Sequence, residues 1–208
     1  KDILTTFRFL RNQQKKADGS KNLSVADFIA PKESGVKDYI GAFAVTAGLG
    51  LENSVTKAKE EHDDYKSIMF KILADRLAEA FAEMLHEKVR KEYWGYAKNE
   101  NLDVNSLIGA KYKGIRPAFG YPSMPDHSEK KILFDLLSVE KNAGISLTEN
   151  FAMYPAASVC GLYFAGKYSS YFNLGPVSEE QVIDYAHRKE INKHVAEKWL
   201  AQNLNYRS

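Results

Sequence analysis

Residues 62–93 read HDDYKSIMFKILADRLAEAFAEMLHEKVRKEY, and this stretch contains neither glycine nor proline. Its apolar residues recur three and four positions apart, which is the spacing of an amphipathic helix. They are Tyr65, Ile68, Met69, Ile72, Leu73, Leu77, Phe81, Met84, Leu85 and Val89. The sequence therefore predicts one long helix. Because packing supplies most of a long helix's stability, we expect this to be the central helix, buried along much of its surface.

Other segments around this helix are typical of strands and of shorter helices. Residues 39–46 (YIGAFAVT) carry no charge and include aromatic and β-branched residues, as a buried strand does. Further strands are predicted over residues 147–153, 158–165 and 168–174, the last two joined in a hairpin at Gly166. Helices are predicted over residues 2–10 and around 105–110. Two more are predicted after the capping patterns of Asp126 with Glu129 and of Ser178 with Gln181, and a last helix begins at about Asn192. Gly95 is expected to end the long helix in a left-handed conformation.

This order of elements determines the fold class that we expect. The strands follow one another as in hairpins, and they do not alternate regularly with helices. The class is therefore α+β, with a largely antiparallel sheet, the long helix at the centre and the other helices flanking it. A length of 208 residues predicts one domain.

Composition excludes several classes of function. The chain has 29 Lys and Arg against 27 Asp and Glu, a formal net charge of +2, which disfavours nucleic-acid binding. The single cysteine, Cys160, excludes an internal disulfide framework and a cysteine-built metal site, and it is compatible with a reducing cytoplasm. No apolar run is long enough to cross a membrane, and the first residues do not resemble a signal peptide.

Common catalytic motifs are absent from the sequence. It contains no phosphate-binding loop, dinucleotide-binding motif, zinc-protease motif or serine-hydrolase motif. We therefore predict no catalytic residue and no metal ligand. His62, Asp63 and Asp64 fit the acidic start of a helix better than a metal site. Cys160 lies among apolar residues, so we interpret it as a buried, inert thiol.

Residues 116–125 (RPAFGYPSMP) contain three of the six prolines, which predicts a rigid loop. Its first residue, Arg116, can bind a carboxylate through two parallel hydrogen bonds. Phe119 and Tyr121 place aromatic rings on either side of Gly120. This pattern indicates either a site for a carboxylate or small molecule, or a structural turn in which Arg116 forms an ordinary salt bridge.

Two weaker features also have two interpretations. The aromatic residues of the predicted hairpin are either part of the core or a stacking wall for a base or a cation. They are Tyr163, Phe164, Tyr168, Tyr171 and Phe172. Asp75 and Glu79 lie one helical turn apart, either on a solvated edge of the long helix or facing a bound ligand.

Residues 114–127 read GIRPAFGYPSMPDH and resemble the C-terminal activation domain of cobalamin-dependent methionine synthase, whose hallmark is R-P-A-x-G-Y-P-x-x-P-x-H. Further segments resemble the same family in the same order, so the resemblance covers nearly the whole chain. These segments are residues 27–32, 38–46, 74–83, 93–96 and 148–153.

The resemblance implies a bent sheet within the α+β class and a domain that binds S-adenosylmethionine. Such a domain presents the methyl group to a cobalamin held by a neighbouring domain of the same polypeptide, for the reductive remethylation of inactive cob(II)alamin. A flavodoxin or a flavoprotein reductase is the implied electron donor. The enzyme is the 5-methyltetrahydrofolate–homocysteine methyltransferase of methionine biosynthesis. The domain alone is not expected to turn over, and zinc is expected only in catalytic modules outside this chain.

The resemblance also implies roles for individual residues around the proline-rich loop. Arg116 would bind the carboxylate of S-adenosylmethionine, and Ala118 would contact the ligand through its backbone. Tyr121 would lie between the ligand and the corrin, in contact with the cobalamin domain. Tyr171 and Phe172 would line a groove at an edge strand.

On the long helix, the resemblance places Glu79 near the ligand and Asp75 towards the cobalamin domain. The chain also departs from the family's pattern. Phe172 stands where tyrosine is common, so stacking is retained there without a hydroxyl group. Ser123 and Met124 stand where the loop often carries alanine and cysteine.

The family's activation domain extends further upstream and contributes an acidic ligand contact from that part. We therefore expect residues 1–208 to be a single activation domain that lacks its N-terminal part. The competing hypothesis is an interaction module that docks on the cobalamin domain and a flavoprotein reductase without binding the ligand. A free-standing methyltransferase is disfavoured because the glycine-rich turn common in such enzymes is absent.

Overall fold

The computed structural model describes residues 2–17 and 19–207, which divide into two compact units. Within the described residues, the first unit contains 2–41, 114–132 and 162–207, and the second contains 42–113 and 133–161. Helices and small two-stranded sheets occur together, so the α+β class is confirmed. The strands form smaller sheets than the sequence suggested.

The main sheet pairs β1 (Gly41–Thr46) with β4 (Ser158–Tyr163). Every residue of β4 is buried, as expected for an apolar strand without charge. Beyond the strands, the Ala47 amide donates to the Ala157 carbonyl at 3.0 Å. The predictions of strands at 39–46 and 158–165 are confirmed.

The second sheet is a short antiparallel pair of β2 (Ser146–Leu147) and β3 (Met153–Tyr154). A continuous strand over residues 147–153 was expected, and this is wrong. The side chain of Thr148 accepts a hydrogen bond from the Ala152 amide at 3.1 Å, and this bond stabilises a turn between the two strands.

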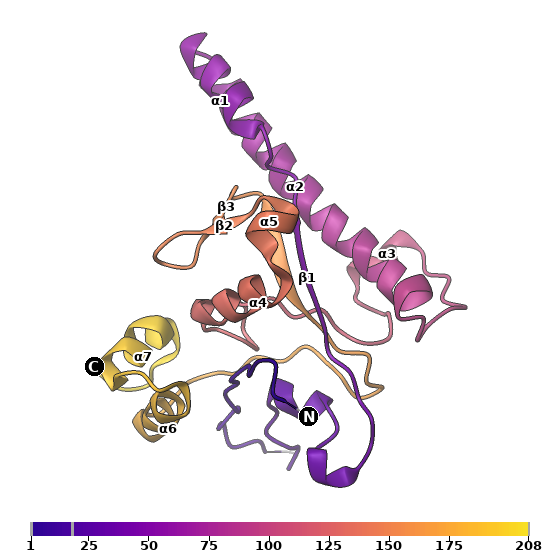
Figure 1. Ribbon diagram of the computed structural model, residues 1–208, viewed down its shortest axis with the longest axis vertical. Helices are drawn as coiled ribbons and strands as arrows, with labels where there is room; N and C mark the ends of the chain where they lie inside the picture. Colours follow the sequence, from indigo (N-terminus) through magenta and orange to yellow (C-terminus); the bar gives the residue numbers. More distant parts are fainter. Residues whose placement is uncertain (1, 18, 208) are drawn as a thin grey trace. The chain divides into compact units, whose positions relative to one another are not determined.

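The helices α1 (Leu51–Glu60) and α2 (Asp64–Lys88) form a hairpin and lie side by side, as Figure 1 shows. The Asp63 carboxylate caps α2 by accepting a hydrogen bond from the Lys66 amide at 2.8 Å. The acidic cluster at the start of the predicted helix is therefore a helix cap. The hairpin packs on itself, and α1 was not predicted from the sequence.

At its C-terminus, α2 continues into the π-helical turn η3 (Val89–Tyr93), which confirms one long helix over the predicted range. Gly95 has a φ of 72°, the left-handed conformation expected after the helix. The fully buried Arg90 fixes the following loop to the helix. Its guanidinium lies 2.8 Å from the Glu100 carboxylate and stacks 4.4 Å from the centre of the Tyr112 ring.

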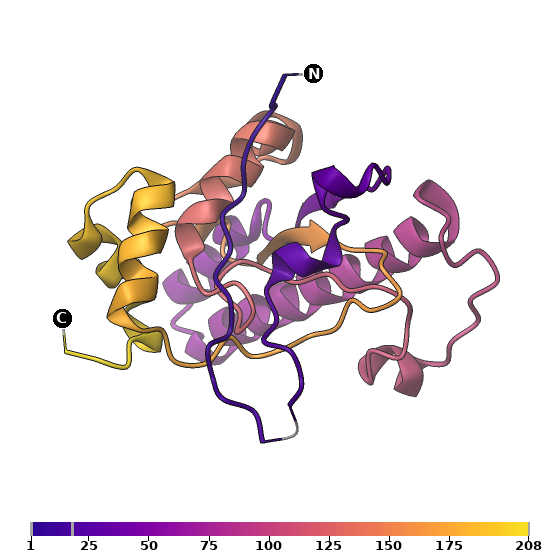
Figure 2. The same ribbon diagram turned by 90° about the horizontal axis from the view of Figure 1, so that it is seen from below.

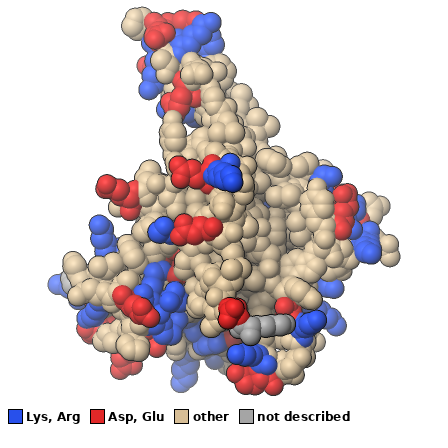
Figure 3. Space-filling model, in the orientation of Figure 1, with Lys and Arg blue, Asp and Glu red and all other residues tan. Residues whose placement is uncertain are grey.

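The packing face of α2 differs from the expected one. Its buried side chains are small or polar, and they follow one another along the helix: Ser67, Ala74, Ala78, Ala82 and His86. In contrast, Leu73, Leu77 and Phe81 are 51%, 61% and 41% exposed. The prediction that α2 is buried along much of its surface is therefore wrong. The helix packs closely through the ridge formed by Ala74, Ala78 and Ala82, and the larger apolar side chains remain exposed. Figure 3 shows charged side chains gathered where α1 meets α2, with mostly uncharged surface directly below.

The first unit has a core beneath the helices α6 (Glu179–Lys189) and α7 (Lys193–Leu200). Figure 2 shows this pair in yellow. Both predicted helices are confirmed: Ser178 caps α6 as expected, and the side chain of Asn192 caps α7. The buried core residues are Leu10, Leu174, Val177, Val182, Tyr185, Ala186, Ala196 and Leu200.

The remaining helical elements are short. The α-helices are α3 (Val104–Ile108), α4 (Lys130–Leu137) and α5 (Val139–Ala143). The 3₁₀ turns are η1 (Val25–Phe28), η2 (Lys32–Ser34), η4 (His127–Glu129) and η5 (Ala201–Asn203). The predictions of a helix near 105–110 and of one after Asp126 are confirmed.

The N-terminal segment was expected to be helical over residues 2–10, and this is wrong. The described residues run as extended chain, drawn in indigo in Figure 2. The backbone of this segment is hydrogen-bonded to distant residues: the Arg8 amide donates to the Glu129 carboxylate at 2.9 Å. Directly after the segment, Arg11 forms an antiparallel bridge with Ser24. Tertiary contacts therefore override the helical spacing of the apolar residues.

Residues 168–174 were expected to form the second strand of a hairpin, and this is also wrong. All seven are described, and they form irregular chain. The turn at Gly166 exists, with the Ser169 amide donating to its carbonyl at 3.1 Å. The chain then leaves β4, and the Leu174 amide donates to the Pro122 carbonyl at 2.9 Å.

Candidate functional site

The proline-rich loop, residues 116–125, is held by hydrogen bonds of its own. Tyr121 and Met124 form an antiparallel bridge, and the Met124 amide donates to the Tyr121 carbonyl at 2.9 Å. The Gly120 amide donates to the Met124 carbonyl at 2.7 Å. Because the prolines fix φ between these bonds, the loop has a defined shape, as predicted.

The centre of the loop requires glycine. Gly120 has a φ of 92°, and a Cβ atom at this position would lie 2.2 Å from Cε1 of the His127 ring. The Lys130 ammonium lies 2.8 Å from Nδ1 of His127. Burial lowers the pKa of His127, and the charge of Lys130 lowers it further. The neutral ring therefore occupies the space that a side chain at position 120 would need.

Neighbouring backbone fixes the start of the loop. Ile115 and Phe164 exchange two backbone hydrogen bonds of 2.9 and 3.0 Å. The Leu162 amide donates to the Pro117 carbonyl at 3.0 Å. The end of β4 and the residue after it therefore position the first residues of the loop.

The first residue of the loop, Arg116, contacts Tyr171. The Arg116 amide donates to the Tyr171 hydroxyl at 3.0 Å, although the two residues are 55 positions apart. Arg116 and Ala118 are half-buried, and Tyr121 and Tyr171 are 56% and 47% exposed. The backbone of Arg116 and the exposed ring of Tyr171 are therefore in direct contact in the first unit, whereas Nε of the Arg116 guanidinium is buried.

The aromatic residues of the predicted hairpin divide between core and surface. Tyr163 and Phe164 are buried, whereas Tyr168 and Tyr171 are exposed. Phe172 is half-buried, and its ring meets the ring of Phe28 edge-on at 6.2 Å between centroids. The core interpretation is therefore confirmed for Tyr163 and Phe164, and the stacking wall stays a prediction for the exposed rings.

A groove of about 1090 Å³ lies beside Phe28 in the same unit. Its lining includes the rings of Phe7, Phe9, Phe164 and Tyr168. The ion pair of Arg11 and Asp27 also lines it, and Arg11 holds the pKa of that carboxyl below its ordinary value. The sequence did not indicate this groove, because its walls come from segments that are far apart along the chain.

Asp75 and Glu79 lie on α2, in the second unit. Both side chains are exposed, and each directly follows an alanine of the buried ridge. They therefore lie on one flank of the helix, one turn apart, as the spacing predicted.

A cluster of buried charges directly follows the loop. Asp126, Glu129, Tyr185 and Lys189 make up this group, which we call the Lys189 cluster. The Lys189 ammonium lies 2.9 Å from the Asp126 carboxylate and also forms an ion pair with Glu129. The Tyr185 hydroxyl donates to the Asp126 carboxylate at 2.6 Å. The sequence indicated Asp126 and Glu129 only as a capping pattern. It did not indicate that Tyr185 and Lys189 of α6 contact them.

The pKa of Asp126 reflects opposing effects. Burial raises the pKa of this carboxyl, but the charge of Lys189 and the hydrogen bonds from Tyr185, Lys189 and Ser128 lower it below its ordinary value of 3.8. Burial and the Asp126 charge raise the pKa of Tyr185. The cluster therefore holds Asp126 as an ionised carboxylate beside the neutral phenol of Tyr185.

Three further observations concern other classes of site. Within residues 2–17 and 19–207, no group of three His, Cys, Asp or Glu side chains could hold a metal ion. No helix in the described part of the chain is both long and apolar enough to cross a membrane. Cys160 is buried in β4, as the sequence predicted.

Comparisons with known proteins point to one family. Residues 1–190 match the family model described as vitamin B12 dependent methionine synthase, activation domain. A solved structure, the crystal structure of the MetH reactivation domain bound to AdoHcy, is similar with a TM-score of 0.96 and 52% sequence identity. The match covers 100% of this chain and 63% of the solved chain, so this chain spans less than two thirds of that domain.

Proposed function

Since the chain belongs to the family of activation domains of vitamin B12-dependent methionine synthase, we propose that it binds S-adenosylmethionine and presents the methyl group to cobalamin. The cobalamin is held by a neighbouring domain of the same polypeptide. The purpose is the reductive remethylation of inactive cob(II)alamin. The observation that carries this proposal is the rigid loop that holds Arg116 against Tyr171, in a chain 52% identical to an AdoHcy-bound domain.

The loop residues match the chemistry of the ligand. The guanidinium of Arg116 binds the ligand's carboxylate, and the backbone of Ala118 contacts the rest of the molecule. The aromatic faces of Tyr171 and Phe172 suit both an adenine ring and a sulfonium cation. Tyr121 lies between the ligand and the corrin, which agrees with its exposed position.

The family resemblance also gives roles to two carboxylates on α2, in the second unit. Glu79 lies near the ligand and favours its positive charge. Asp75 faces the cobalamin domain. Both side chains are accessible in the second unit, as these roles require.

Methyl transfer needs little chemistry from this chain. Cobalamin, when bound by the neighbouring domain, supplies the cobalt centre that accepts the methyl group. The ligand's sulfonium is already an activated leaving group, so the residues of this chain bind, orient and neutralise charge. No acid or base is needed, which agrees with the lack of catalytic motifs. S-adenosylhomocysteine is the product that remains.

The whole protein has further proposed properties. A flavodoxin or flavoprotein reductase delivers the one electron that reactivation requires. Zinc belongs to catalytic modules outside this chain. The enzyme acts in methionine biosynthesis in the cytoplasm, and this domain alone does not turn over.

Calorimetric titration with S-adenosylmethionine tests the proposal. Arg116→Ala should weaken binding by about 2–5 kcal/mol, because the ligand's carboxylate loses its charged partner. The control is Arg207→Ala, which removes an exposed guanidinium of the C-terminal segment and should leave the affinity unchanged. Equal affinity of Arg116→Ala and the unaltered protein would exclude this carboxylate site. If the unaltered protein gave no heat and no thermal shift, the alternative of a pure interaction module would be favoured.

A further inference from the structure

The Lys189 cluster joins the end of the proline-rich loop to α6. Asp126 follows Pro125 directly, so the carboxylate and the loop are separated by one peptide bond. Asp126 and Glu129 are only 4% and 2% exposed. Lys189 reaches both carboxylates from a position about 60 residues further along the chain.

The carboxylate of Asp126 accepts hydrogen bonds both from its own turn, η4, and from α6. One set of hydrogen bonds is local: the Ser128 amide and hydroxyl donate to the carboxylate at 2.7 and 2.9 Å, which caps η4. A second set comes from α6, through Tyr185 and Lys189. The same carboxylate thus fixes both the direction in which the chain leaves the loop and its distance from α6.

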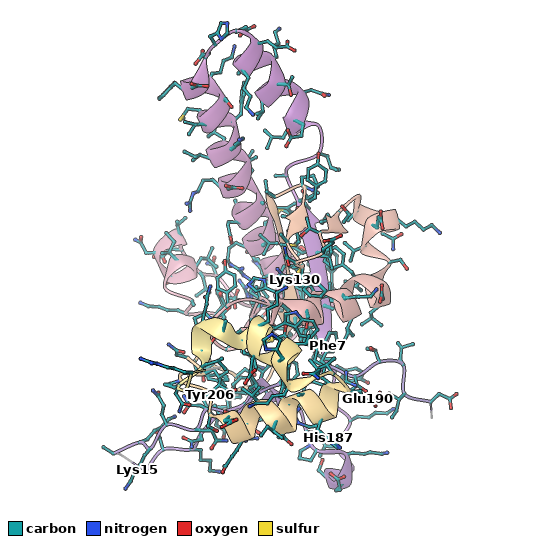
Figure 4. All side chains as sticks on the ribbon, turned by 90° about the vertical axis from the view of Figure 1, so that its left-hand side faces the viewer. Phe7, Lys15, Lys130, His187, Glu190 and Tyr206 are labelled. Atoms are coloured by element: carbon teal, nitrogen blue, oxygen red, sulfur yellow. The ribbon has the colours of Figure 1, made fainter. Side chains whose placement is uncertain are left out.

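Lys189 is the central charge of the cluster. Besides its two carboxylate partners, its ammonium lies 5.4 Å from the centre of the Tyr185 ring and 5.3 Å from that of Trp199. Figure 4 looks onto α6 and α7 and labels His187 and Glu190 beside the last turn of α6, where Lys189 lies. A buried lysine with two buried carboxylates is favourable only while all three charges are present.

Other charged groups face the cluster from several elements. The Arg8 amide, in the N-terminal segment, donates to Glu129. Arg188 lies 5.5 Å from the Tyr185 ring, on α6 itself. Lys130 and His127 contact each other at the start of α4 and in η4. The Lys189 side chain contacts both carboxylates.

The cluster does not itself bind a ligand. The space beside it measures about 10 Å³ and is lined by Arg8, Phe119, Asp126, Glu129 and Tyr185 among others. A volume of this size holds about one water molecule. Any effect of the cluster on ligand binding must therefore act through the loop.

We infer that Lys189 is a positioning residue, which holds the loop bearing Arg116, Ala118 and Tyr121 in its binding conformation through Asp126. This inference rests on the proposed function, because the affinity that it controls is that for S-adenosylmethionine. Lys189 itself does not touch the ligand. Removing its charge leaves the buried carboxylates of Asp126 and Glu129 without this ammonium. Of the two side chains of α6 that contact Asp126, the hydroxyl of Tyr185 then remains, so the attachment of the loop end to α6 is weakened.

The principal test compares Lys189→Met with Lys193→Met. Lys193 lies on α7 and forms ion pairs with Glu179 and Glu197, so its loss also removes a charged contact of this helical pair. We expect Lys189→Met to bind S-adenosylmethionine at least about tenfold more weakly at pH 8, and Lys193→Met to stay within about twofold of the unaltered protein. Circular dichroism verifies that both variants are folded.

Two further measurements separate positioning from a general loss of stability. Lys189→Arg keeps the charge and should restore most of the affinity. Hydrogen exchange of the Gly120 and Met124 amides reports on the loop without any ligand, and it should accelerate in Lys189→Met alone.

The outcomes are distinguishable. Unchanged affinity and unchanged loop exchange in Lys189→Met would overturn the inference. So would an equal loss of affinity in Lys193→Met, because it would show general destabilisation. If the unaltered protein did not bind S-adenosylmethionine, yet loop exchange accelerated only in Lys189→Met, the proposed function would fail and the positioning role would stand.

Discussion

At Gly120 the absence of a side chain lets the loop close over the His127 ring. The backbone there has a φ of 92°, and the imidazole fills the space beside it. The neutral form of the ring suits this place, because burial and Lys130 lower its pKa. Gly35 offers a comparison: its φ is 68°, but a Cβ atom there would meet nothing within 4 Å.

Gly120→Ala should therefore destabilise the protein more than Gly35→Ala. The change at position 35 adds only backbone strain, which costs about 1 kcal/mol. At position 120 the methyl group also meets the imidazole, and we expect a total loss of about 3 kcal/mol. Urea denaturation of both variants measures the difference. Equal losses would show that the His127 ring moves aside without cost.

Asp126 makes stability depend on pH. Its pKa is lowered in the folded protein, since the charge and hydrogen bonds of Lys189 and the other donors outweigh burial. The stabilisation is therefore complete above the ordinary value of 3.8 and is lost as the pH falls through the lower, folded value. Thermal midpoints from pH 7 downwards should show Asp126→Asn less stable than the unaltered protein at neutral pH. The gap should narrow below about pH 4, and a gap independent of pH would contradict this role.

The sequence predicted some of these residues and missed others for physical reasons. Proline spacing revealed the loop and placed Arg116 at its start, because proline restricts the backbone in any context. Lys189 and Tyr185 were missed. They look like ordinary polar and aromatic positions of a helix, and only the folded chain brings their side chains to a carboxylate about 60 positions upstream.

At the level of elements, α2 packs through its alanines. The ridge that includes Ala74, Ala78 and Ala82 is buried, whereas Leu77 on the neighbouring flank is 61% exposed. Exposed apolar residues in a row are typical of surfaces that contact other proteins. The ridge also sets the orientation of Asp75, which directly follows a buried alanine.

On α2, enlarging a buried alanine should destabilise the protein more than truncating an exposed leucine. Ala78→Leu adds volume at a site that is 1% exposed and should cost about 1–3 kcal/mol. Leu77→Ala removes an exposed side chain and should change stability by less than about 0.5 kcal/mol. Chemical denaturation measures both, with circular dichroism to compare helix content. A larger loss in Leu77→Ala would mean that this face is the packed one.

Periodicity and caps predicted the long helix, α6 and α7, since these signals depend on local chemistry. The helix α1 was missed because only Val55 and Ala58 of its side chains are buried, which leaves almost no apolar pattern. The wrong prediction of a helix over residues 2–10 has a different cause from the missed helix α1. Apolar spacing was present there, but backbone partners such as Glu129 hold the chain extended. Periodicity cannot reveal such distant partners.

At the scale of the whole molecule, the chain is an activation domain built from two compact units. The loop and Tyr171 belong to the first unit, and Asp75 and Glu79 belong to the second. The solved AdoHcy-bound domain is longer, since this chain matches 63% of it.

The bridge between Tyr121 and Met124 has a kinetic consequence. A loop that is already ordered in the free protein needs no rearrangement when a small molecule arrives, so association should follow a single step. Variants that weaken contacts without releasing the loop should then differ mainly in residence time. A variant that releases the loop should also slow association, because only a fraction of the molecules would be competent to bind at any moment.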